Sequence, residues 1–251
     1  MALVDLRQLA ACRRNFVQYL SLCEMFEKKY SDVSFVWNQK EAVQHEIDRV
    51  SLEIIPESFK EPFLQVCSSG NGNCLFNSAS IAIYGNERLL LELRLRTSIE
   101  LAVHREFCRN HPVSRGAKIL FNSARNGVGT IPKESLFDLL CFNSESECVF
   151  NKEGFQAAFK NQVTATSMNH TYRGTLQIMG LASVVGVPLE TLYPEQKDKL
   201  LPVYQNTFLP RTGTYHSNRV IRIMWTNTNK WPDCSKELKV NHFVPLLRKC
   251  R

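Results

Sequence analysis

The stretch 68–80, SSGNGNCLFNSAS, restricts the fold of this chain more than any other part of its sequence. Residues 70–73 alternate glycine with asparagine directly before Cys74, and a run of apolar and small residues follows at once. Because glycine tolerates backbone conformations that other residues avoid, this sequence predicts a tight loop. The apolar run ends at Gly85, as helices commonly do. We therefore expect a loop that places Cys74 at the beginning of a buried helix.

Apolar spacings predict that helices come first and that strands accumulate late in the chain. Residues 1 to about 60 are expected to be helical, with a second helix over roughly 38–51. Further helices are expected at 86–107, 134–140, 152–163 and 174–186, and strands at 187–193, 218–226 and 238–247. This order is typical of an α+β fold. It divides the chain into a helical N-terminal extension, residues 1–60, and a main domain, residues 61–251.

Three explanations compete for the glycine-rich loop. A nucleotide-binding loop fails on its residues, because G-x-G-x-x-G needs glycine where Leu75 stands and G-K-[ST] needs a lysine. A tight turn before a core helix stays open, because buried free cysteine is common. The third explanation is a nucleophile at a helix N-terminus, where unpaired N–H groups and the helix dipole favour thiolate over thiol. The loop could then turn the N–H groups of Asn71, Gly72 and Asn73 toward a developing oxyanion.

A thiol nucleophile needs a base, and His242 stands out among the six histidines of the chain. It interrupts an otherwise apolar strand, VNHFVPLL, whereas the other five lie in polar stretches or in the amphipathic helix over 86–107. A lone histidine in a strand is commonly a structural residue, so that interpretation stays open. Its combination with the Cys74 loop favours a Cys–His catalytic pair.

Composition limits the cellular context and the partners. The nine cysteines are odd in number, irregularly spaced and without a C-x-x-C pair, which favours reduced thiols in a cytoplasmic or nuclear protein and provides no zinc motif. No apolar run reaches the roughly 18 residues that span a membrane. The net charge is +7, but the positive residues are scattered, so we expect a solvated basic surface rather than a nucleic-acid partner.

GNGNCLFNSAS resembles the signature of OTU-type (ovarian tumour) cysteine proteases, which usually reads G-D-G-N-C-L-[FY]-R-[AS]. NHFVPL near the C-terminus resembles the histidine strand of that family, and TYRGTLQIMGLASVVGVPLETLY resembles the helix and strand between the two. The resemblance covers residues 61–251 and is closest to OTU domains of transposon-derived and uncharacterised animal proteins. It implies a papain-like fold in which a small central β-sheet packs between helices.

The same resemblance implies a deubiquitinase that hydrolyses isopeptide or peptide bonds at the C-terminus of ubiquitin. Its implied nucleophile is Cys74, its implied general base is His242, and the loop of Asn71, Gly72 and Asn73 supplies the oxyanion donors. The implied partners are ubiquitin, polyubiquitin chains or a ubiquitin-like modifier. The resemblance implies no metal, no organic cofactor and no membrane.

Two departures from the family pattern affect the catalytic set. The family's aspartate three residues before the cysteine is Asn71 here, which keeps the backbone N–H but loses the carboxylate. Period-two alternation places Val240 and Val244 on the face of His242, where the family commonly has Asp or Asn to orient the imidazole. The orienting group is then expected elsewhere, and the candidates are Asn227, Asn229, Asp233 and Asp48. These departures keep a second function open, a catalytically weak or inactive OTU fold that binds ubiquitin.

Overall fold

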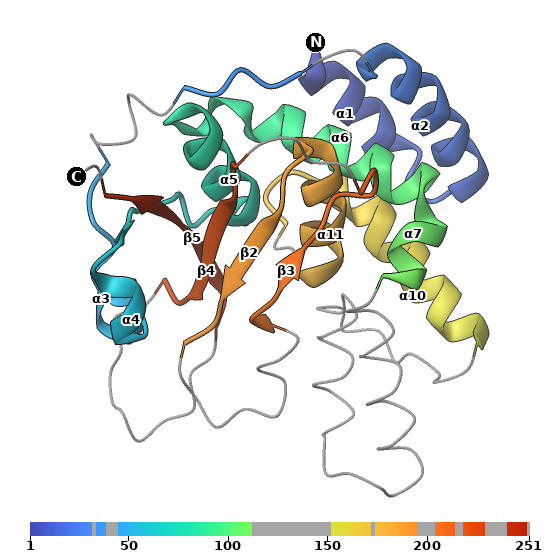
Figure 1. Cartoon of the computed structure of the whole chain (residues 1–251). Coiled ribbons are helices and arrows are strands. Elements are labelled where there is room, and N and C mark those ends of the chain that lie inside the picture. The colour runs from blue at the N-terminus through green and yellow to red at the C-terminus, as the bar shows by residue number, and fades with distance from the viewer. Residues whose placement is uncertain are drawn as a thin grey trace, which may run out of the picture.

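The computed structural model describes residues 1–31, 34–38, 45–111, 152–171, 174–194, 204–213, 218–228 and 240–249 (Figure 1). The helices are α1 (Ala2–Ala11), α2 (Phe16–Tyr30), α3 (Arg49–Ile54), α4 (Glu57–Lys60), α5 (Cys74–Tyr84), the 3-10 helix η2 (Glu87–Leu89), α6 (Leu90–Val103), α7 (Arg105–Asn110), α10 (Lys152–Thr166) and α11 (Thr175–Val185). The strands are β1 (Phe63–Gln65), β2 (Leu189–Leu192), β3 (Thr207–Phe208), β4 (Ile221–Thr226) and β5 (His242–Arg248). These elements confirm the predicted α+β class.

The strands of the described sheet lie in the order β1-β5-β4-β2-β3. β2 and β4 are parallel, and the other neighbouring strands are antiparallel. The strands predicted at 187–193, 218–226 and 238–247 are present as β2, β4 and β5. β1 and β3 were not predicted, because strands of three and two residues are too short to show alternation. The sheet places His242, the first residue of β5, opposite Thr226 at the end of β4.

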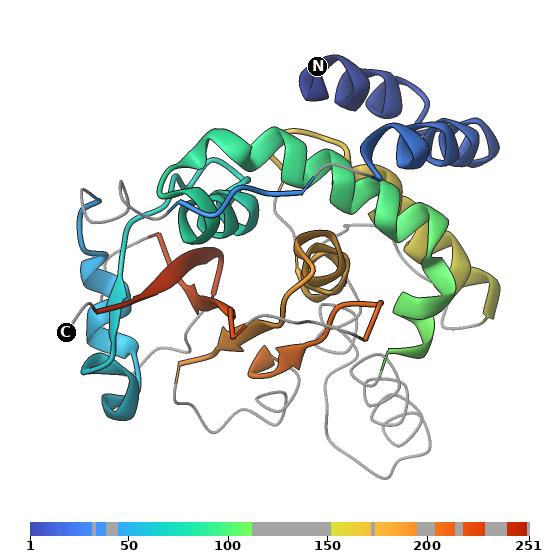
Figure 2. The same cartoon turned by 45° about the horizontal axis from the view of Figure 1, so that its top comes forward.

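Helices α5 and α11 cover one face of the sheet, and α6 lies behind them (Figures 1 and 2). On this face Phe243 of β5 packs with Ile178 of α11 and with the buried side of α5. Farther from the sheet, α1, α2 and α10 form a second cluster with α6, in which Leu9 is fully buried. On the opposite face of the sheet, Ile55 packs with Val244. The sheet thus lies between helices on its two faces, and α5 packs directly against β5.

The N-terminal segment differs from the predicted run of helix. α1 and α2 are separate helices. The helix predicted over 38–51 is wrong for residues 38 and 45–48, which are not helical, and only its last residues, 49–51, belong to a helix, α3. Ile47 instead forms an antiparallel β-bridge with Val66. The backbone groups of this segment therefore form hydrogen bonds with another extended segment and not within a helix. The domain boundary after residue 60 stays a prediction.

Of the other predicted helices, some lie within the described ranges and one lies outside them. Those at 86–107, 152–163 and 174–186 are present as α6 with α7, as α10 and as α11. The helix expected at 134–140 lies outside the described residues. Within the described ranges, no helix combines the length and the apolar character needed to cross a membrane.

Candidate active site

Cys74 is the first residue of α5, as the loop sequence predicts. The helix ends at Gly85, whose φ of 84° lies in the left-handed region that favours glycine. Nearly every residue of α5 is buried, and Cys74 itself is 2% exposed. The local sequence therefore places the thiol at the first residue of the helix, and packing of the core shields it from water.

The loop before the thiol is shaped by Gly72 and Asn71. Gly72 has a φ of 79°, and a Cβ at this residue would lie 2.4 Å from the carbonyl oxygen of His170. The Oδ1 of Asn71 accepts hydrogen bonds from the Asn73 N–H at 3.2 Å and from the Asn77 Nδ2 at 3.5 Å. An aspartate at position 71 could accept the same bonds. Of the three expected oxyanion donors, the N–H of Asn73 is therefore already engaged within the loop.

The guanidinium of Arg94, on α6, is fully buried and holds this loop to the end of α10. Its Nη2 donates to the Gly72 carbonyl at 3.1 Å and to the Asn73 Oδ1 at 2.7 Å. Its Nη1 donates to the carbonyls of Thr166 and Met168 at 2.9 Å and 2.7 Å. One planar fork thus joins two segments that are distant in the sequence.

His170 contacts the same loop. Its φ of 56° is the one positive φ of a non-glycine residue in the described part of the chain. Its N–H donates to the Asn73 Oδ1 at 3.2 Å, and its Nδ1 lies 3.1 Å from the carbonyl oxygen of Asn71. A backbone conformation of this kind costs about 1–3 kcal/mol and persists only where its surroundings fix it. His170 is therefore part of the structure that supports the loop.

Burial raises the pKa of the Cys74 thiol to about 11. Hydrogen bonding with the backbone of Phe243 and Leu75 and the charge of Arg94 oppose this rise without cancelling it. The backbone N–H groups at the helix N-terminus do lower the pKa of the thiol, as expected, but the loss of hydration on burial raises it more. At neutral pH the thiol is protonated, and a base must remove its proton when it reacts.

Alkylation of Cys74 by iodoacetamide is expected to be slow at neutral pH and to accelerate by about tenfold per pH unit toward alkaline pH, because only the thiolate reacts. Mass spectrometry that resolves the modified residue, from about pH 6 to about pH 9, measures this rate. The Cys74→Ala variant shows which signal belongs to this residue. A rate that is already constant below about pH 7 would indicate a preformed thiolate–imidazolium pair and would contradict the raised pKa.

His242 begins β5 and is 4% exposed. Its Nε2 lies 3.2 Å from the Oγ of Ser68, whereas its buried Nδ1 has no hydrogen-bond partner among the described residues. A Cβ on Gly70 would lie 3.9 Å from this Nδ1, so the glycine-rich loop borders the ring. Burial lowers the pKa of His242, which keeps the imidazole neutral and able to accept a proton at neutral pH.

The residues expected to orient the imidazole have different outcomes. Asn229 and Asp233 lie outside the described residues, and Asn227 directly follows β4. Burial lowers the pKa of the imidazole, and the Asp48 carboxylate opposes this shift through its charge. The Oδ1 of Asp48 accepts the Ser51 N–H at 2.7 Å, as the N-cap of α3. Asp48 therefore acts on the ring electrostatically, while its hydrogen bond stabilises a helix.

Cys74 begins α5 and His242 begins β5, and the glycine-rich loop borders both residues. The backbone of Phe243, the residue after His242, lowers the pKa of the Cys74 thiol, so the beginning of β5 lies beside the sulfur. The two reactive groups are not hydrogen-bonded to each other here, because Nδ1 has no partner in the described residues and Nε2 faces Ser68. A protonated thiol, a neutral imidazole and a helix N-terminus are nevertheless gathered around one loop. These groups are suited to acyl transfer once Nδ1 reaches the sulfur.

Sequence analysis assigned no role to Arg94, His170 or Ser68. Arg94 carried a signal, because it lies four residues before Ser98 and seven before Leu101 on the buried face of α6. The other two carried none, because their hydrogen-bond partners in the site are 97 and 174 residues away in the sequence. Only the tertiary structure brings these side chains to the loop and the imidazole.

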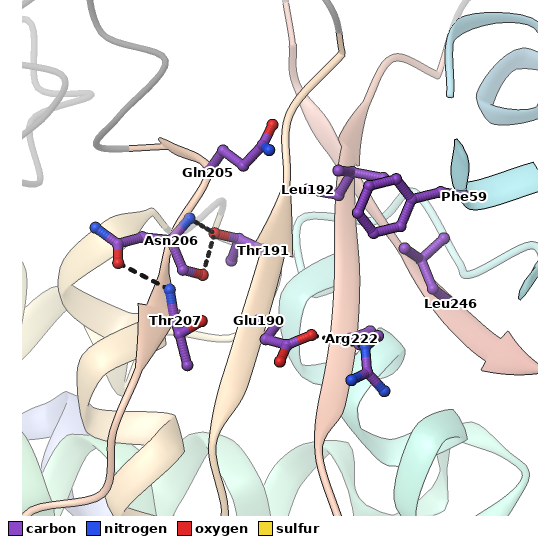
Figure 3. A pocket seen from close by; sticks show the side chains of 9 residues that line it. All are labelled: Phe59, Glu190, Thr191, Leu192, Gln205, Asn206, Thr207, Arg222 and Leu246. Atoms are coloured by element: carbon purple, nitrogen blue, oxygen red, sulfur yellow. Dashed lines mark hydrogen bonds and ion pairs between the residues drawn. The ribbon is translucent and has the colours of Figure 1, made fainter. Parts of the chain in front are cut away.

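A separate hollow of about 180 Å³ lies beside β2, β3 and β4 (Figure 3). Glu190 and Arg222 form an ion pair at 2.6 Å across neighbouring strands of this hollow, and Phe59 borders it from α4. Neither Cys74 nor His242 lines it, so it is distinct from the candidate active site. The described ranges contain no group of three or more His, Cys, Asp or Glu side chains that could hold a metal ion.

Comparisons with known proteins give matches to a family model, to curated relatives and to solved structures. The family model described as "Vertnin, OTU domain" matches residues 65–226. The chain is 25% identical to vertnin of Mus musculus over 203 residues (80% of this chain, 25% of that protein) and 27% identical to vertnin of Bos taurus over 180 residues (72% and 25%). It thus spans about a quarter of the length of these curated relatives. Among solved structures, the viral OTU domain protease from Farallon virus aligns with a TM-score of 0.41 and 14% identity, over 76% of this chain and 87% of that chain.

Proposed function

The chain belongs to the vertnin OTU-domain family, and on that premise we propose that it is a cysteine-type deubiquitinase. Its substrates are ubiquitin, polyubiquitin chains or a ubiquitin-like modifier, cleaved at the isopeptide or peptide bond after the modifier's C-terminus. One observation carries this proposal. Cys74 begins α5, the buried His242 begins β5, and both border the glycine-rich loop.

The proposed reaction begins with proton transfer from the Cys74 thiol to the Nδ1 of His242. Because burial raises the pKa of the thiol and lowers that of the imidazole, this proton moves as the sulfur attacks the carbonyl carbon. Loop and helix N–H groups stabilise the resulting oxyanion. His242 then protonates the departing amine, and water hydrolyses the thioester to release ubiquitin and restore the thiol.

The state of the thiol favours a second candidate function. Cys74 is 2% exposed, and the unpartnered Nδ1 in the described structure means that the pair is not hydrogen-bonded. A ubiquitin-binding OTU fold with weak or no turnover has no need of an aligned pair. The two candidates make opposite predictions for chemistry at Cys74, and a single experiment separates them.

A ubiquitin carrying an electrophilic C-terminus is expected to add once to the protein, at Cys74. Intact mass and peptide mapping measure the adduct, and Cys74→Ala should abolish it. The matched control is Cys67→Ala, because Cys67 lies before the loop and burial raises the pKa of its thiol. On a cleavable ubiquitin substrate, His242→Ala should lower turnover by roughly 10² or more, since the general base is lost.

The outcomes of this capture experiment are distinct. An adduct that survives Cys74→Ala, or that maps to Cys67, contradicts the assignment of the nucleophile. Tight binding of ubiquitin without an adduct supports the binding module instead. Capture of a ubiquitin-like modifier with no capture of ubiquitin would keep the chemistry and change the substrate.

A further inference from the structure

Ser68 contacts both His242 and the backbone that follows it. Its Oγ lies 3.2 Å from the Nε2 of His242 and 2.5 Å from the carbonyl oxygen of Phe243. The Oγ of Ser78, on α5, lies 3.0 Å from the same carbonyl oxygen. Ser68 therefore connects the imidazole to a fixed point of β5, in a region where both serines and the ring are at least partly buried.

The direction of these hydrogen bonds follows from what each group can donate. A carbonyl oxygen only accepts, so the hydroxyl of Ser68 donates its single proton to Phe243. The Ser68 oxygen then accepts from the Nε2 of His242, which must carry a hydrogen. A neutral imidazole has one N–H, so its lone pair is at Nδ1. This is the buried nitrogen without a hydrogen-bond partner in the described residues.

We propose that Ser68 is the positioning residue of His242 and holds the imidazole in the tautomer whose Nδ1 is the base. The inference rests on the proposed function, because it assigns the orienting role within the same Cys–His pair. Among the described candidates, the Oδ1 of Asp48 accepts the Ser51 N–H as the N-cap of α3, and Val244 is apolar and packs with Ile55. Asn229 and Asp233 lie outside the described residues. Ser68 thus takes the orienting role for which the resembling enzymes commonly use Asp or Asn, but from the chain after β1 rather than from the histidine strand.

A hydroxyl orients the ring but carries no negative charge to stabilise an imidazolium. Its loss should therefore affect the chemical step and leave the binding of ubiquitin unchanged. Ser68→Ala is expected to lower kcat roughly tenfold with KM unchanged, which is the effect of losing one hydrogen bond to the base. Ser68→Thr keeps the hydroxyl and should restore most of the rate.

Ser78→Ala is the matched control. It removes a hydroxyl that is bonded to the same Phe243 carbonyl and lies 3.4 Å from the Ser68 Oγ, but that is not bonded to the imidazole. A merely structural contribution of this serine pair would lower kcat equally in Ser78→Ala and Ser68→Ala. We expect Ser78→Ala to retain kcat within about twofold, with folding of each variant checked by thermal melts.

The tautomer of His242 provides a readout that does not depend on activity. In protein labelled with ¹⁵N-histidine, the imidazole nitrogen shifts report which nitrogen carries the proton, and His242→Gln assigns the signals. The wild-type ring should be neutral, with its proton on Nε2. In Ser68→Ala the Nδ1-protonated tautomer should appear, whereas Ser68→Thr and Ser78→Ala should keep the wild-type pattern.

The two readouts separate this inference from the proposed function. If wild-type protein shows no turnover but the tautomer depends on Ser68, the deubiquitinase proposal fails and Ser68 still positions the ring. A wild-type ring protonated on Nδ1 overturns the inference, whatever the activity. Equal tautomer populations in wild type and Ser68→Ala overturn it as well.

Discussion

Replacing Gly72 by valine is expected to lower turnover of a ubiquitin substrate by on the order of 10²- to 10³-fold, the range associated with losing an oxyanion donor. Gly72 has a φ of 79°, a region in which a β-branched residue is strained by about 1–3 kcal/mol. The Cβ of valine would also lie 2.4 Å from the carbonyl oxygen of His170. The contact is with backbone, so relief requires the loop to move and its N–H groups to turn away.

Substitutions at Asn71 are the matched controls for Gly72→Val. Asn71→Asp keeps an acceptor for the Asn73 N–H and should retain activity within about tenfold. Asn71→Ala loses the acceptor of the Asn73 N–H and of the longer Asn77 bond, each worth about 1 kcal/mol at most, and should be only modestly slower. Turnover of all three variants on one substrate, with thermal melts to confirm folding, shows whether the loop acts through its backbone or through the side chain of Asn71. If folded Asn71→Ala is as slow as Gly72→Val, the side chain of Asn71 itself takes part in catalysis.

Arg94→Ala is expected to lower the free energy of unfolding by roughly 3–5 kcal/mol, one of the largest effects available to a single substitution. The guanidinium is fully buried and donates to the carbonyls of Thr166 and Met168 and to the Asn73 Oδ1. Each buried acceptor left without a donor costs about 1–3 kcal/mol. Loss of these bonds also frees the loop before Cys74, so turnover should fall with stability.

Urea unfolding followed by fluorescence measures this loss, and Arg96→Ala is the control on the same helix. Arg96 pairs with Glu92 at 3.5 Å across one turn and lies over the Phe35 ring at 4.4 Å. Its loss leaves no fully buried carbonyl acceptor of the described residues without a donor, so we expect a smaller loss of stability than for Arg94→Ala. Arg94→Lys keeps the charge but not the planar fork, so it should recover only part of the stability. Equal stability of Arg94→Ala and Arg96→Ala would mean that the buried fork contributes little to this fold.

Many of the helices and strands can be predicted from the local sequence. Alternation and β-branched residues predict β4 and β5, and the small apolar run before Gly186 predicts α11. The loop chemistry predicts Cys74 at the first residue of α5. These features depend on neighbours a few residues apart, so a single sequence suffices for them. Strands of three and two residues are too short to show alternation, so β1 and β3 are recognised only from their pairing in the sheet.

By itself, then, the sequence identified Cys74 and His242 as the candidate catalytic pair and predicted the elements that begin with them. Only the tertiary structure decided the protonation and orientation of both. Burial outweighs the helix dipole at the thiol, and the depth of burial depends on how the whole core packs. The partner of the imidazole nitrogen is a serine 174 residues earlier, brought close because the chain leaving β1 runs beside β5. No local period encodes such a contact, because it arises from the pairing of distant strands.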